Sequence, residues 1–152
     1  MRRKVLSACI VAALGVGYGA AAFSQAKPET LVKQRQAVMT LHWKYFGPLS
    51  AMARGRAPYN AEVVARNAAY LEALSTMPWS DFDPSTKNAK SPALPAIFSE
   101  PAKFKQAQER YQSELAKLVA LSKSGDEASV KAQIGVVDKA CGNCHDNFRE
   151  PF

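Results

Sequence analysis

Apolar side chains recur every three or four residues along four stretches of the chain, which is the period of a helix with one buried face. The first stretch begins at Pro28, which suits the first turn of a helix, and ends at Gly55. Pro48 is expected to kink this helix because its nitrogen cannot bond back to the carbonyl of Lys44. The predicted inner stripe comprises Val32, Gln36, Met39, Trp43 and Phe46.

The second helical stretch begins at Asn60, a favourable N-cap residue, and is predicted to end at Pro78. Five of the nine prolines lie between Pro78 and Pro101, so this segment is predicted to be a loop. Because the loop carries Trp79 and Phe82, we expect it to fold back over something hydrophobic. The predicted inner side of the second helix comprises Val63, Val64, Asn67, Tyr70, Leu71, Leu74 and Met77.

The third and fourth stretches follow each other closely. Ser99 is the predicted cap of the third helix, with Pro101 in its first turn, and Gly125 is the predicted stop. Asp126 then caps the fourth helix. The third inner stripe comprises Phe104, Gln108, Tyr111, Leu115 and Leu118, and the fourth comprises Val130, Ile134, Val137, Cys141, Cys144 and Phe148. With no alternating strand pattern, the sequence predicts an all-α fold, an antiparallel four-helix bundle.

The residues before the first predicted helix have the composition of a leader segment. The chain has 152 residues, enough for one domain, and residues 1–26 have the cationic start, apolar run and small-residue exit of a cleavable secretory signal peptide. The alternative is an uncleaved membrane anchor. Cleavage after Ala26 removes three of the 20 basic side chains and none of the 13 acidic ones, which leaves a net charge of +4 on residues 27–152. No Lys/Arg cluster remains that could follow a phosphate backbone, so we expect neither a nucleic-acid partner nor a membrane partner after signal removal.

The chemistry lies in the last helix, where Cys141, Cys144 and His145 form C-x-x-C-H, the attachment sequence of c-type haem. Thiols at i and i+3 can each add to one vinyl group, and a histidine at i+4 supplies the proximal iron ligand. A redox dithiol or half of a zinc site are the alternatives. A redox dithiol normally follows a strand, and a zinc site needs more ligands than His42 can add. The motif therefore predicts one covalent haem c near the C-terminus of the last helix.

Residues 27–152 resemble the cytochrome c prime family, which includes low-spin six-coordinate members. A haem near the end of the last helix distinguishes this family from the small cytochromes c that carry it near the N-terminus. The segments that carry the resemblance are residues 33–39, residues 57–61, residues 74–82 with Met77-Pro78-Trp79, and residues 141–149.

The resemblance implies roles for residues of the first helix. Arg35 and Gln36 match the pair that reaches the haem edge and propionates, where a planar guanidinium binds a carboxylate at two points. Met39 matches the position that faces the sixth coordination site. Its sulfur would either ligate the iron, giving His/Met coordination and a raised potential, or merely fill space. We expect ligation. His42 departs from the usual apolar residue and would be a rival ligand, a distal hydrogen-bond donor or a side chain at the bundle rim.

The resemblance also implies roles outside the first helix. Thr86 and Lys87 match a Thr-Glu pair beside the haem, with the charge of the second residue reversed. Arg149 matches a basic residue on the proximal side. The family often forms homodimers, and Leu41, Tyr45 and Leu49 lie off the haem-facing line, where they would supply such a surface.

Three functions follow from these residues. The first is a periplasmic electron carrier that exchanges electrons with redox partner proteins, its iron held by His145 and Met39. The second is a five-coordinate cytochrome c prime that binds nitric oxide or carbon monoxide at an open sixth site. The third is a haem-free thiol protein. No acid–base pair or other nucleophile suggests an enzyme. The sequence leaves open the spin state, the potential, the physiological partners and the choice between monomer and dimer.

Overall fold

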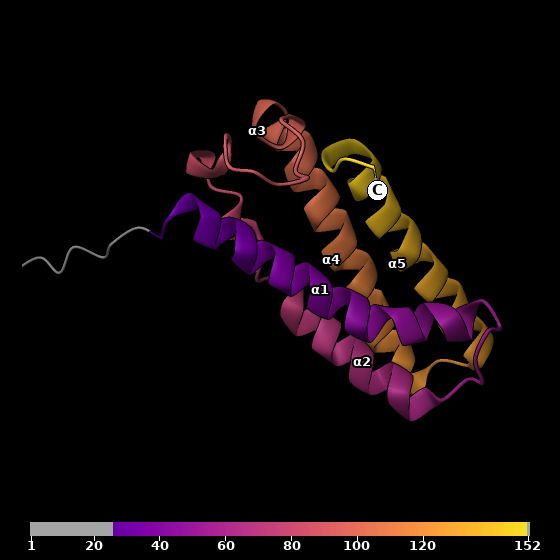
Figure 1. Ribbon diagram of the computed structural model, residues 1–152. Helices are drawn as coiled ribbons and strands as arrows, with labels where there is room; N and C mark the ends of the chain where they lie inside the picture. Colours follow the sequence, from indigo (N-terminus) through magenta and orange to yellow (C-terminus); the bar gives the residue numbers. More distant parts are fainter. Residues whose placement is uncertain (1–25, 152) are drawn as a thin grey trace, which may run out of the picture.

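A computed structural model describes residues 26–151, and the leader predicted at residues 1–26 lies almost entirely outside them. Four long helices alternate in direction (Figure 1), as the sequence predicts. They are α1 (Pro28–Ala53), α2 (Ala61–Leu74), α4 (Pro101–Ser124) and α5 (Glu127–Phe148). The proline-rich segment between α2 and α4 is mainly loop, with the 3-10 turns η1 (Trp79–Asp81) and η2 (Pro84–Thr86) and the one-turn helix α3 (Ala96–Ser99).

Side-chain caps fix the start of two helices where the sequence places them. The Oδ1 atom of Asn60 accepts a hydrogen bond from the Val63 N–H at 3.0 Å, and Oδ1 of Asp126 accepts one from the Ser129 N–H at 3.0 Å. The prediction that Ser99 caps the third long helix is wrong, because Ser99 is the last residue of α3. The cap position of α4 is Glu100, whose side chain makes no capping bond.

Helix ends follow local backbone chemistry. α1 continues through Pro48, and its ribbon changes direction in the C-terminal half (Figure 1), in line with the missing proline donor. α2 ends at Leu74 instead of at Pro78, because Ser75 already turns the chain, its N–H bonded to Leu71 and Glu72 carbonyls. At Gly125 any Cβ would lie 2.7 Å from the Leu121 carbonyl oxygen, so only glycine fits the tight exit from α4.

The core is formed by apolar side chains of all four long helices. Several predicted inner positions are wrong: Trp43 is 71% exposed, Tyr70 is 46% exposed and Met77 is 52% exposed. Conversely, Leu49, predicted to lie on a dimer surface, is fully buried. The buried apolar core residues include Phe46, Leu49, Met52, Val64, Ala68, Leu71, Tyr111, Leu115, Leu118, Val119, Val130, Ile134, Val137 and Ala140.

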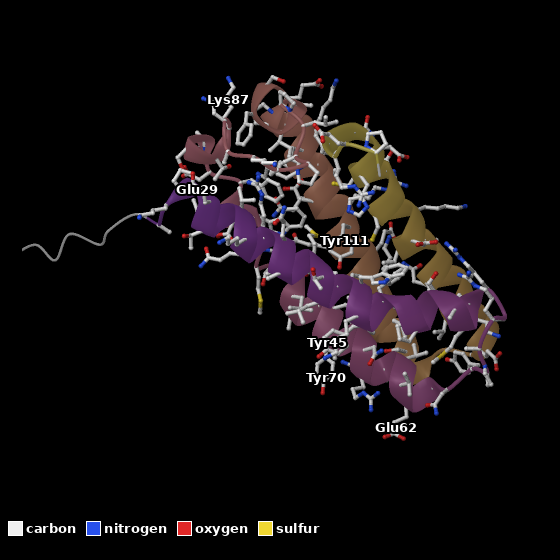
Figure 2. All side chains as sticks on the ribbon, viewed as in Figure 1. Glu29, Tyr45, Glu62, Tyr70, Lys87 and Tyr111 are labelled. Carbon is white, nitrogen blue, oxygen red and sulfur yellow. The ribbon has the colours of Figure 1, made fainter. Side chains whose placement is uncertain are left out.

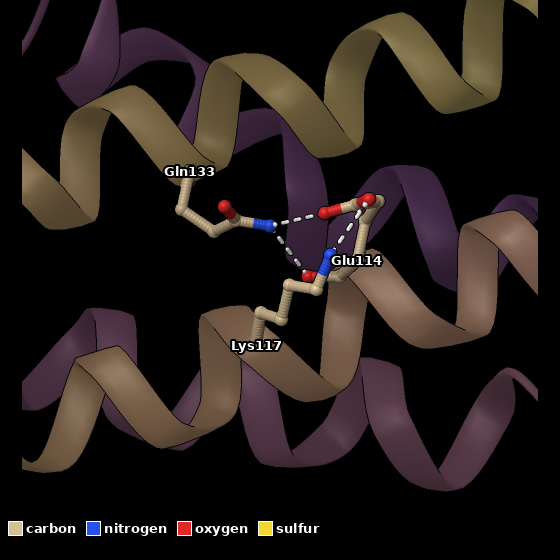
Figure 3. Close-up of polar contacts among 3 residues, drawn as sticks. All are labelled: Glu114, Lys117 and Gln133. Carbon is tan, nitrogen blue, oxygen red and sulfur yellow. Dashed lines mark hydrogen bonds and ion pairs between the residues drawn. The ribbon is translucent and has the colours of Figure 1, made fainter.

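Polar contacts hold α4 and α5 together along their packed faces. The Nε2 atom of Gln133 donates to both the backbone oxygen of Glu114 at 2.8 Å and its Oε2 at 3.0 Å (Figure 3). Lys117 Nζ lies 3.0 Å from the other carboxylate oxygen of Glu114. These donors lower the pKa of the Glu114 carboxyl, the hydrogen bond from Gln133 most of all. Within residues 26–151, no helix is both long and apolar enough to cross a bilayer.

Candidate haem-binding site

The C-x-x-C-H motif lies on the last two turns of α5, which is helical without a break from Glu127 to Phe148. Cys141, Cys144 and His145 therefore share one face, because side chains three and four positions apart lie above one another on a helix. All three are half-buried, and both cysteines are free thiols. Burial, helped by nearby Asp138, raises the pKa of Cys141 to about 12, so the thiol is protonated at neutral pH. Burial also raises the pKa of Cys144.

The imidazole of His145 is held in its neutral form. Burial lowers its pKa, and the positive charge of Arg149 lowers it further, with Asp146 acting in the opposite direction. A neutral imidazole has a free lone pair, which is what a proximal iron ligand requires. The Arg149 N–H also bonds the His145 carbonyl at 3.0 Å and so closes the helix directly after the motif.

Arg35 is buried, with 3% of its surface exposed, and reaches from α1 into the loop. Its guanidinium donates to the Asp81 carbonyl, to Thr86 Oγ1 and to Ser91 Oγ, each at 3.0 Å. It also lies over the Phe82 ring, 4.4 Å from the centroid. Burial lowers the pKa of this group, which remains a cation because an arginine does not deprotonate in a protein. No carboxylate oxygen within residues 26–151 forms a salt bridge with it, so a charged donor is held inside the protein by neutral acceptors.

The other predicted propionate contacts occupy different environments. Thr86 is buried at the end of η2 and accepts from Arg35 while its hydroxyl donates to the Asp83 carbonyl at 2.7 Å. Gln36 is exposed on α1, and Lys87 is exposed on the loop, where it projects away from the bundle (Figure 2). The structure thus brings Arg35 and Thr86 into direct contact and leaves Gln36 and Lys87 on the surface.

Two candidate distal residues follow Arg35 along α1. Met39 is half-buried one turn further on, and His42 is half-buried one turn beyond Met39. The His42 ring faces Tyr111 of α4, with ring centroids 5.7 Å apart, and Tyr111 lies in the middle of the bundle (Figure 2). Burial raises the pKa of Tyr111, and Cys141 of the motif raises it further, so Tyr111 lies near both His42 and Cys141.

Aromatic rings from three elements form a cluster at the same end of the bundle. Phe104 of α4 lies 5.0 Å from Phe82 and 5.2 Å from Phe148, measured between ring centroids, in edge-to-face contacts. Trp79 joins at 5.9 Å from Phe104 and donates its Nε1–H to the Ser75 carbonyl at 2.5 Å. The prediction that the loop carrying Trp79 and Phe82 folds back over something hydrophobic is confirmed, because both rings belong to an aromatic cluster that includes the last turn of α5.

The loop is fastened to the end of the motif helix as well as to α1. The Leu94 N–H donates to the Phe148 carbonyl at 3.0 Å, and the Glu150 N–H donates to the Pro92 carbonyl at 2.8 Å. Ala93 and Arg149 thereby form a short antiparallel bridge. Through Ser91 and Arg35, this segment connects the N-terminal half of α1 to the residues that directly follow His145.

Comparisons with known proteins agree with this geometry. The family model described as Cytochrome C' matches residues 30–149. Cytochrome c' of Rubrivivax gelatinosus is 41% identical over 125 residues, which cover 82% of this chain and 97% of that protein. The chain belongs to the cytochrome c prime family.

Solved structures of cytochrome c prime match the fold as well as the sequence. The crystal structure of the Rubrivivax gelatinosus protein has a TM-score of 0.77 at 40% identity and covers 82% of this chain and 98% of that one. A nitric oxide complex of a variant of cytochrome c prime from Alcaligenes xylosoxidans has a TM-score of 0.77 at 38% identity, covering 84% and 99% of the two chains.

Cytochrome c prime proteins carry covalently bound haem c, and the residues of this chain fit that group. Two protonated, unpaired thiols and a neutral histidine are present at the spacing that the attachment requires. The buried guanidinium of Arg35 suits a carboxylate, and His42 Nε2 is a buried nitrogen with no hydrogen-bond partner within residues 26–151. This cytochrome c prime would hold its haem through Cys141, Cys144 and His145, and the iron would supply an axial site for a ligand.

Sequence reasoning missed two partners of the predicted site. Ser91 and the Asp81 carbonyl hold Arg35, yet they lie 56 and 46 residues away along the chain. Neither has a motif around it. The hydroxyl residues of the proline-rich loop are the one sequence signal that points to Ser91 as a hydrogen-bond partner. No side-chain signal points to the Asp81 backbone carbonyl.

Proposed function

We propose that this cytochrome c prime binds a neutral diatomic gas, nitric oxide or carbon monoxide, at the iron position opposite His145. Cys141 and Cys144 would attach the haem, and Arg35 with Thr86 would face its propionates. Arg149, beside His145 on the proximal side, would favour the neutral form of that ligand. The nitric oxide complex reported for the Alcaligenes xylosoxidans relative supports this function over electron transfer with His/Met ligation.

The observation that carries the proposal is the apolar interior facing the motif. Among residues 26–151, Arg35 is the only buried charged side chain. The aromatic cluster of Trp79, Phe82, Phe104 and Phe148 lines the same end of the bundle. An apolar interior penalises charged or strongly hydrated ligands and admits small neutral ones. Met39 is half-buried on α1, one turn beyond Arg35, and would restrict the size of the ligand.

Spectra of the haem-loaded protein test the proposal. We expect the ferrous protein to bind carbon monoxide and nitric oxide, each with a shift of the Soret band, and Met39→Ala to bind them faster because the side chain no longer fills space. Lys33→Ala, an exposed change on the same helix, is the matched control. A methionine-to-iron charge-transfer band that is lost in Met39→Ala, together with no gas uptake by the native protein, would instead establish the electron carrier.

We also propose that residues 1–26 are removed on export and that the mature domain, residues 27–152, works in the periplasm. The predicted signal peptide and the c-type attachment motif support this location. N-terminal sequencing of the protein from a periplasmic fraction tests it, and Lys27 is the expected first residue. A protein that begins at Met1 in the membrane fraction would contradict it.

A further inference from the structure

His42 is held by its own helix in one defined orientation. Its Nδ1 atom lies 2.8 Å from the Val38 carbonyl oxygen, one turn earlier in α1. A carbonyl oxygen can only accept a hydrogen bond, so Nδ1 must carry the hydrogen. Burial lowers the pKa of the ring, which favours the neutral form over the cation. In a neutral imidazole with hydrogen on Nδ1, the other nitrogen, Nε2, has a free lone pair.

That Nε2 lone pair is inside the protein. The atom is buried and has no hydrogen-bond partner within residues 26–151. The ring packs on Tyr111, which is close enough to Cys141 for the thiol to influence its pKa. His42 and Cys141, which would attach the haem, therefore both lie beside the buried cluster that contains Tyr111.

These contacts decide among the three roles that the sequence allows for His42. A side chain at the rim would leave Nε2 in water, whereas this Nε2 is buried. A distal hydrogen-bond donor would need hydrogen on Nε2, whereas the bond to Val38 places it on Nδ1. The remaining role for His42 is that of a metal ligand, in which the Nε2 lone pair binds the iron. Its geometry matches the usual pattern in which one ring nitrogen of a metal-binding histidine donates to a backbone carbonyl and the other ligates.

We propose that His42 Nε2 is a displaceable second axial ligand of the haem iron, opposite His145, which an incoming gas must replace. This proposal rests on the gas-binding function proposed above. It identifies His42 as the gate, the side chain that occupies the iron position until a gas displaces it. Nε2 donates its lone pair to the metal without any proton transfer, because the hydrogen stays on Nδ1 throughout. Met39 then packs beside the bond instead of forming it.

The chain is well suited to a decisive test because its full sequence contains only two histidines, His42 and His145. Holoprotein labelled with ¹⁵N-histidine would be examined in the ferric state by continuous-wave and pulsed electron paramagnetic resonance. The variants are His42→Leu and Met39→Leu. Trp43→Leu introduces the same residue at a neighbouring position that is 71% exposed and serves as the matched control. Circular dichroism and the haem content per chain show that each variant folds and is loaded.

We expect a low-spin signal with two histidine nitrogens coupled to the iron in the native protein, in Met39→Leu and in Trp43→Leu. His42→Leu should lose the second nitrogen and become high-spin. If the ligand occupies the iron in about nine molecules of ten, the apparent carbon monoxide affinity rises about tenfold in His42→Leu. A high-spin native protein, or a low-spin signal that survives in His42→Leu, would overturn the proposal.

The spectra and the gas titration separate the two proposals. Loss of the second nitrogen in His42→Leu without gas uptake by any variant supports the ligand and overturns the gas-binding function. Gas uptake by a native protein with one coupled histidine nitrogen supports the gas-binding function and overturns the gate.

Discussion

Arg35 shows how one side chain can organise a site before any cofactor is considered. Its three hydrogen bonds reach three separate points of the loop, at Asp81, Thr86 and Ser91. Hydrogen bonds to a charged donor contribute more than neutral ones, and an interior cation that loses its acceptors is costly. The loop therefore takes its position from α1 through this one residue.

Replacing Arg35 by alanine is expected to lower the free energy of unfolding by about 3 kcal/mol, because three acceptors lose their donor and the packing on Phe82 is lost. Chemical denaturation of the holoprotein measures the change. Lys33→Ala, exposed on the same helix, should change stability by less than about 0.5 kcal/mol. Equal effects of the two substitutions would show that the hydrogen bonds of Arg35 contribute nothing net.

At the scale of helices, the sequence predicts the inward faces of α4 and α5 and two of the three side-chain caps, and it is wrong at single positions of α1 and α2. The caps Asn60 and Asp126 form as predicted, since a cap depends on residues three positions away. In α1 the predicted stripe is correct at Val32 and Phe46, which are buried, and wrong at Gln36 and Trp43, which are exposed, whereas Arg35 is buried. A helical period gives the spacing of a stripe, but which side is covered depends on neighbours far away in sequence. For Arg35 that neighbour is the loop.

The candidate site likewise contains residues that the sequence predicts and contacts that it does not predict. The candidate residues for haem attachment can be predicted because Cys141, Cys144 and His145 are adjacent on one helix. The anchors of the loop were not, because Leu94 and Phe148 meet through backbone groups that every residue possesses. Backbone pairing between segments 54 residues apart leaves no signature in side-chain type.

The exit from α4 gives a prediction about glycine. Alanine at Gly125 would place Cβ 2.7 Å from the Leu121 carbonyl oxygen, so Gly125→Ala is expected to destabilise the protein by more than about 1 kcal/mol. Gly135, inside α5, has no atom within 4 Å of its Cβ position. Gly135→Ala is therefore expected to stabilise the protein by about 0.5–1 kcal/mol through helix propensity. Thermal unfolding of both variants measures the contrast, and effects of the same sign would contradict it.

The cap of α5 gives a prediction about pH. Hydrogen bonds from Ser129 lower the pKa of Asp126 below its ordinary 3.8. The charge therefore stabilises the folded state above pH 3.8, and this contribution is lost as the pH falls through the lower pKa of the folded protein. Asp126→Asn keeps an acceptor but removes the charge, so its unfolding midpoint should approach the native one in acid. Asn60→Asp adds a charge at the α2 cap, so its unfolding midpoint should lie above the native one at neutral pH and approach it in acid. A gap between Asp126→Asn and the native protein that does not depend on pH would contradict the charge effect.

At the scale of the whole molecule, the buried apolar faces hold the four helices together, and the surface charges contribute little. Arg54 of α1 and Asp138 of α5 form an ion pair between helices, but their side chains are 54% and 35% exposed. Exposed pairs of this kind contribute less than about 1 kcal/mol. Leu115 is fully buried among the helices, where truncation leaves a cavity.

We therefore expect Leu115→Ala to lower the free energy of unfolding by about 3 kcal/mol, and Arg54→Ala by less than about 1 kcal/mol. Urea denaturation at equal haem loading measures both, and repeating it at high salt should change the result for the native protein only slightly. A loss in Arg54→Ala as large as that in Leu115→Ala would mean that the ion pair, instead of the core, holds α1 against α5.

The double attachment of the loop has a consequence for the separation of α1 and α5. Arg54, directly after α1, forms an ion pair with Asp138 of α5. In Figure 1 the N-terminal end of α1 and the C-terminal end of α5 lie apart. At these ends, the loop is tied to α1 through Ser91 and to α5 through residues 92–94. It acts as a spacer of fixed length between the two helices. A residue gained or lost near Ser91 would reset the gap between these two helices, so loop length can change the interior space of the bundle without any substitution in α1 or α5.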